Sequence, residues 1–155
     1  MAATGLDVFD KTLQTTHIWL DELMKVVGPD RQVAWHVMGV VIRVLRDRIP
    51  LGLASHLGSQ LPLLVRGLYY DQWEPEKPPL KIRDTEEFLL TISEGFGNIR
   101  PVDAKEATRA VFNVLSSQID PGQARKVQEA LPEEIRRQLW PDSFFVGESD
   151  DKESS

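Results

Sequence analysis

The sequence contains no cysteine, which excludes disulfides, thiolate nucleophiles and cysteine-ligated metal sites. A chain without disulfides fits a reducing compartment. The first ten residues carry no basic segment and no uninterrupted apolar run, so they do not resemble a secretory signal. We therefore expect a cytoplasmic protein.

Long apolar runs and excess positive charge are missing as well. The longest apolar run, residues 33–45, is interrupted by His36 and Arg43 and is too short to span a bilayer. Of the net charge of -6, residues 142–155 contribute -4 through five acids and one base. The remainder is nearly neutral and lacks the basic face that nucleic-acid binding needs. We predict no membrane or nucleic-acid partner, and a disordered acidic tail over residues 142–155.

Recognisable catalytic and metal-binding patterns are also absent. His17, His36 and His56 do not have the spacing of metal ligands. Ser55 and His56 are only neighbours in sequence, whereas a nucleophile needs a base placed beside it in space. Gly95–Phe96–Gly97 lacks the third glycine of a dinucleotide-binding loop. We therefore predict no metal, no cofactor and no enzymatic activity; a hydrolase that uses His56 is the weaker alternative.

What the sequence does contain is helical periodicity, with no alternation long enough for a strand. Aspartate, proline and glycine mark where helices begin and end. Residues 30–49 are apolar almost all round, which predicts a central, buried helix. The predicted helices cover residues 7–27, 30–49, 51–60, 85–96, 101–119 and 121–131, with two more that begin at Pro62 and Pro132.

The predicted helices form two similar sets. At a shift of 70 positions Ala34 meets Ala104, Val41 meets Val111, and Leu61–Pro62 meets Leu131–Pro132. The first helices align at a shift of 69. We predict an all-α fold of eight helices, built as two tandem four-helix repeats that pack into one compact body with a pseudo-twofold axis. The single domain would span residues 1–141, with repeat one at 6–73, a proline-rich connector at 74–84 and repeat two at 85–141.

Two long segments carry a family resemblance. They are LRDRIPLGLASHLGSQLPLLVRGLYYDQWEP at 45–75 and ATRAVFNVLSSQIDPGQARKVQEALPEEIRRQLWP at 107–141. The chain resembles the bacterial domain-of-unknown-function 2267 (DUF2267) family over roughly residues 6–140. The resemblance implies an all-helical, duplicated fold, and it implies no reaction, cofactor or catalytic residue. Family members commonly have glycine at the place of Gln72, so the turn before Trp73 is expected to differ here.

The two halves differ at polar and aromatic positions. Arg46–Asp47–Arg48 stands where the second half has Ser116–Ser117–Gln118, and Tyr69–Tyr70 stands where it has Leu139–Trp140. Arginine can bind carboxylate or phosphate through two parallel hydrogen bonds, and aromatic residues anchor interfaces. The candidate binding or interface residues are Arg46, Asp47, Arg48, His56, Gln60, Arg66, Tyr69, Tyr70 and Trp73.

These residues also have a structural interpretation. Arg46 and Arg48 would pair with Asp47, Asp71 or Glu74 at helix ends, and the aromatic residues would fill the seam between the halves. The predicted function is a non-enzymatic helical module that binds a partner protein or forms a homodimer. The alternative is a sensor or carrier that holds an acidic or apolar small molecule between the two repeats.

Overall fold

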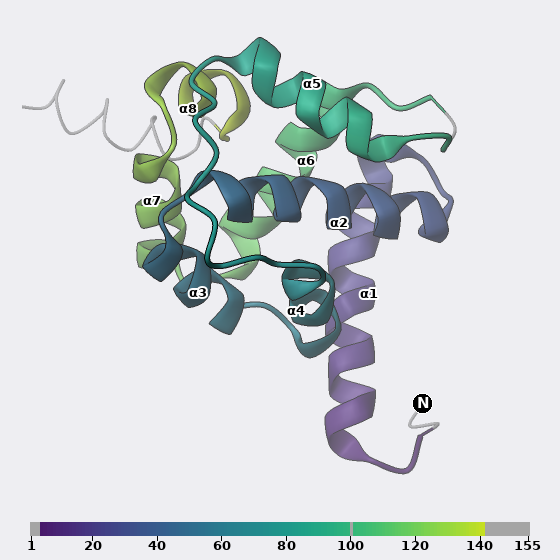
Figure 1. Cartoon of the computed structure of the whole chain (residues 1–155). Coiled ribbons are helices and arrows are strands. Elements are labelled where there is room, and N and C mark those ends of the chain that lie inside the picture. Colours follow the sequence, from purple (N-terminus) through teal and green to yellow (C-terminus); the bar gives the residue numbers. More distant parts are fainter. Residues whose placement is uncertain (1–3, 100, 142–155) are drawn as a thin grey trace, which may run out of the picture.

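The computed structural model describes residues 4–99 and 101–141, and within them the chain forms eight helices and no strand (Figure 1). The predicted all-α class is therefore confirmed. The acidic tail predicted for residues 142–155 lies outside the described residues. The helices are α1 (Asp7–Val27), α2 (Arg31–Arg48), α3 (Leu51–Ser59), α4 (Leu63–Tyr70), α5 (Thr85–Phe96), α6 (Ala104–Gln118), α7 (Pro121–Ala130) and α8 (Glu133–Leu139).

Side-chain caps set the start of four helices. The carboxylates of Asp30, Asp84, Asp103 and Asp120 each accept a hydrogen bond from a backbone N–H of the first turn. The cap at Asp103 explains one wrong boundary. The sixth helix was predicted to begin at Pro101, but it begins just after the capping aspartate.

Proline sets the start of three more helices, but not as predicted. Pro62 was expected at the first helical position. Instead Pro50, Pro62 and Pro132 are N-cap residues with extended backbone (ψ near 150°), and the helix begins one residue later. Pro121 does occupy a first-turn position, behind the Asp120 cap. The two Leu–Pro corners are thus built alike.

Helix α2 lies in the middle of the molecule and packs against α1, α4, α5 and α6 (Figure 1). Its apolar residues Ala34, Val37, Val41 and Leu45 are completely buried, as predicted for a central helix. All eight helices contribute buried residues to one continuous core. None of the helices in residues 4–99 and 101–141 combines the length and apolar character that a membrane crossing requires.

The helices of the two predicted repeats pack across each other. Helix α1 packs against α6, and α2 packs against α5, while α3 contacts α7 and α2 contacts α6. Within the halves, α1 contacts α4 as α5 contacts α8. These pairings are those that a pseudo-twofold relation would produce, and the duplication itself stays a prediction.

Candidate functional site

The end of α2 holds the chain that leaves α4. Arg46 is only 5% exposed, and its Nη1 donates to the backbone oxygens of Tyr69 (2.7 Å) and Asp71 (3.0 Å). Its Nε and Nη2 donate to the two carboxylate oxygens of Asp47, at 2.8 and 3.1 Å. The carbonyls at the end of a helix have no partner within the helix. Arg46 supplies hydrogen-bond donors to the carbonyls at the end of α4.

The next two residues hold the far end of the connector. The backbone oxygen of Asp47 accepts from the backbone N–H of Leu80 at 2.7 Å, and Nε of Arg48 donates to the backbone oxygen of Ile82. Residues 46–48, which we call the α2 clamp, therefore bind the chain on both sides of the proline-rich stretch. Arg46 pairs with Asp47, as the structural interpretation expected, and the other bonds of Arg46 and Arg48 go to backbone carbonyls.

Partial burial affects the guanidinium groups around the clamp. Burial lowers the pKa of Arg43, and Asp71 opposes this shift. Burial also lowers the pKa of Arg48, with a further contribution from Arg83. Arginine remains cationic despite such shifts. Nη1 of Arg43 donates to the backbone oxygen of Leu68 at 3.3 Å, so a second arginine of α2 supports α4.

The predicted aromatic residues join α4 to α3. Tyr69 is fully buried, and its hydroxyl donates to the backbone oxygen of Ala54 at 2.6 Å. Burial raises the pKa of the Tyr69 phenol. The Tyr70 ring lies 5.1 Å from the Tyr69 ring and 5.2 Å from the Trp73 ring, centroid to centroid. Gly58 leaves the space for the Tyr70 ring, since a Cβ at this position would overlap it. These contacts stay within the first half of the chain.

The turn between α4 and the connector depends on Gln72. Its φ is 58°, and among the described residues it is the one non-glycine residue with positive φ. Glycine is the residue that adopts this conformation without steric cost. The left-handed turn is therefore present even though glutamine stands at the position where the resemblance implies glycine.

Three predicted site residues lie apart from the clamp. Within the described residues the exposed His56 side chain makes no hydrogen bond. Oε1 of Gln60 accepts from the backbone N–H of Asp120 at 3.2 Å and so links α3 to α7. Nη2 of Arg66 donates to the backbone oxygen of Leu61 at 2.9 Å, which supports the Leu–Pro corner. In residues 4–99 and 101–141, no group of three or more His, Asp or Glu could hold a metal ion.

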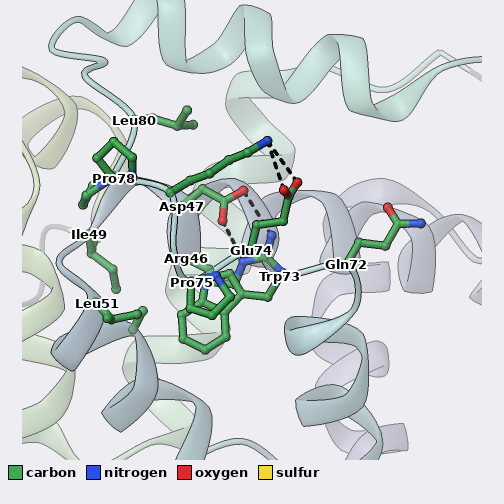
Figure 2. A pocket seen from close by; sticks show the side chains of 13 residues that line it. Arg46, Asp47, Ile49, Leu51, Gln72, Trp73, Glu74, Pro75, Pro78 and Leu80 are labelled. Atoms are coloured by element: carbon green, nitrogen blue, oxygen red, sulfur yellow. Dashed lines mark hydrogen bonds and ion pairs between the residues drawn. The ribbon is translucent and has the colours of Figure 1, made fainter.

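A pocket of about 240 Å³ lies between the α2–α3 junction and the connector (Figure 2). We call it the connector pocket. Of the predicted site residues it contains Arg46, Asp47 and Trp73. The sequence reasoning missed its remaining members, although the proline-rich EPEKPP stretch was a signal for an extended wall. The further lining residues are Ile49, Leu51, Ala54, Gln72, Glu74, Pro75, Lys77, Pro78, Pro79 and Leu80.

A second surface lies on α1, whose N-terminal half extends beyond the other helices (Figure 1). Its apolar stripe steps by three and four residues, with the buried Thr16 between Leu13 and Leu20, and its C-terminal half, with Leu20 and Leu23, is buried in the core. In the N-terminal half, Leu6, Phe9 and Leu13 are 50%, 47% and 39% exposed. We call these three residues the exposed stripe. The sequence showed that these three residues are apolar, but it did not show that the other helices leave this part of α1 uncovered.

The comparison with protein families gives one match. The model of the family described as an uncharacterised conserved protein (DUF2267) matches residues 16–138, so the chain belongs to this family. No curated protein matches the chain. The match covers both the clamp and the connector.

Proposed function

We propose that this member of the DUF2267 family is a non-enzymatic protein-interaction module that docks through α1 onto a second copy of itself. The single observation that carries the proposal is the exposed stripe. Leu6, Phe9 and Leu13 continue, at the same three–four spacing, the stripe that the body covers further along α1. Residues with this spacing lie along one side of a helix and form the seam of helix pairs.

Burial of such a stripe is favourable. Removing apolar surface from water contributes about 25 cal/mol per Å². Helix α4, which packs beside α1, adds the exposed residues Leu63 and Leu64 (50% and 41% exposed). A helix that packs against α1 thus exposes apolar residues as well.

A second copy fits this surface best in antiparallel orientation. A parallel pair would bring the acids Asp7 and Asp10 of both first turns together. An antiparallel pair through Leu6, Phe9 and Leu13 places Asp7 near Lys11 of the other copy and keeps the two bodies at opposite ends. The stripe is much smaller than a standard interface of roughly 20–30 residues per side. We therefore expect a weak, reversible dimer.

Sedimentation equilibrium over a range of concentrations tests the dimer. The double variant Phe9→Ser/Leu13→Ser should weaken dimerisation about tenfold or more without unfolding the chain, since both residues are exposed. The control is Ile18→Ser, which alters a residue of equal exposure (46%) away from the stripe. A monomer at all concentrations, or an equal effect of Ile18→Ser, contradicts the proposal.

The charge distribution and composition support two further parts of this proposal. The absence of cysteine supports a cytoplasmic location, and the acidic net charge of -6 supports a protein rather than a nucleic acid as partner.

The alternative, a small-ligand sensor or carrier, is favoured by the connector pocket. That pocket lies between the first half and the connector rather than between the two predicted repeats.

A further inference from the structure

The connector pocket is preorganised because its walls are held at both ends. Hydrogen bonds from Arg46 fix the chain before Trp73, and the bond from Leu80 to Asp47 fixes it after the prolines. Between these points the connector makes one backbone hydrogen bond, from the N–H of Lys77 to the oxygen of Glu74. The pocket therefore keeps its shape without a ligand, which lowers the entropic cost of binding.

The charges that line the pocket cancel in pairs. Arg46 is bound to Asp47 at 2.8 Å (Figure 2). Lys77 is bound to Glu74 at 3.1 Å. An ionic ligand would meet no net opposite charge and would have to displace one of these partners. The lining thus favours an uncharged ligand.

Apart from Gln72, the remaining lining residues are apolar, and several of them carry rings. The half-buried Trp73 ring, the rings of Pro75, Pro78 and Pro79, and the buried Ile49 side chain line the space. Aromatic rings stack favourably on such surfaces. A volume of about 240 Å³ is below the usual range for drug-sized ligands, so one ring or two fused rings is the scale that fits.

One polar group in the lining can orient the ligand. The Asp47 side chain is 38% exposed, and each of its carboxylate oxygens accepts one bond from Arg46. A carboxylate oxygen can accept a second hydrogen bond. A hydroxyl or N–H group on the ligand would be a suitable donor.

We infer that the connector pocket binds a small, uncharged aromatic molecule whose hydroxyl or N–H donates to Asp47. This site goes beyond the proposed dimerisation and lies on different residues from the exposed stripe. The probes are phenol and indole, which carry the donor; toluene, which lacks it; and benzoate and benzylamine, which carry charge.

Titration of the ¹⁵N-labelled full chain, followed by NMR, tests the inference. Phenol and indole should give saturable shifts at the Trp73 side-chain N–H and at the backbone amides of Ala54 and Leu80. Toluene should bind about tenfold more weakly, because it cannot donate to Asp47. No saturable shift up to about 10 mM of phenol or indole would overturn the inference. Equal binding of benzoate or benzylamine would overturn the uncharged class.

Matched variants locate the site. Trp73→Ala should weaken phenol binding at least tenfold, whereas Trp35→Phe, a change on α2 outside the lining, should leave it unchanged. Leu51→Trp provides a second variant, because it replaces an exposed lining side chain with a bulkier one that carries a ring. The exposed position has room for the larger side chain. Unchanged phenol binding in both the Trp73 and Leu51 variants would overturn the site. Phe9→Ser/Leu13→Ser should bind phenol normally, which separates this inference from the proposed dimer.

Discussion

Replacing Arg46 tests whether the α2 clamp holds α4 and the connector together. The side chain is 5% exposed and donates four hydrogen bonds, two of them to the carbonyls of Tyr69 and Asp71. Arg46→Ala leaves these carbonyls without that donor and leaves the Asp47 carboxylate without its cation. Breaking a fully buried pair costs about 3–5 kcal/mol, and the 38% exposure of Asp47 reduces the charge penalty. We expect the free energy of unfolding to fall by about 3 kcal/mol.

Two further variants separate geometry from charge. Arg46→Lys keeps the charge but has no planar fork, so it should still lose about 1–2 kcal/mol. Arg137→Ala is the control, because Arg137 is 69% exposed and lies 3.7 Å from Glu133; it should change stability by less than about 0.5 kcal/mol.

Urea unfolding with the slope m measured for each variant is the assay. Hydrogen exchange at the amides of Trp73 and Leu80 gives an independent measure, since the clamp fixes both ends of the connector. A loss below about 1 kcal/mol for Arg46→Ala, or a loss as large for Arg137→Ala, would refute the reasoning.

Three other substitutions, at two positions, give outcomes with a definite sign. Tyr69→Phe should cost about 1 kcal/mol through the bond to Ala54. Burial raises the pKa of Tyr69, so its contribution to the free energy of unfolding is complete below about pH 10 and is lost as the pH rises further. Above about pH 10 the free energy of unfolding should therefore fall more steeply with pH for the wild type than for Tyr69→Phe. Gln72→Gly should raise stability by about 0.5 kcal/mol in thermal unfolding, since it relieves a φ of 58°; Gln72→Val should lower it, and the reverse order would contradict the strain.

Helix positions were predictable because their signals are local. Asp30, Asp84 and Asp120 cap helices at starts that aspartate was predicted to mark, and Gly28 and Gly97 follow the predicted ends at residues 27 and 96. The errors are local too. A proline before a helix can serve as the N-cap or as the first helical residue, and its fixed φ suits both, so the sequence alone could not place Pro62.

The two candidate surfaces were not predictable in the same way. Periodicity shows which side of α1 is apolar, but it does not show where the covering helices end, and that point decides the exposure of Phe9. The prolines of the connector predicted an extended chain, but the partner of that chain depends on tertiary packing. The connector lines one pocket together with Ile49 and Ala54, which are far from it in sequence.

The difference between the two halves has a structural cause that directs the search for function. At the position of the clamp, 70 residues further on, the last residues of α6 are Ser116, Ser117 and Gln118. Their hydroxyls donate back into α6, to Phe112 and Val114. The first half is followed by a connector that must be held, and Arg46 and Arg48 hold it. Because these arginines are engaged with backbone oxygens, they are poorly placed to bind an external anion. The connector pocket, which the clamp shapes and the Trp73 ring lines, remains available to a ligand.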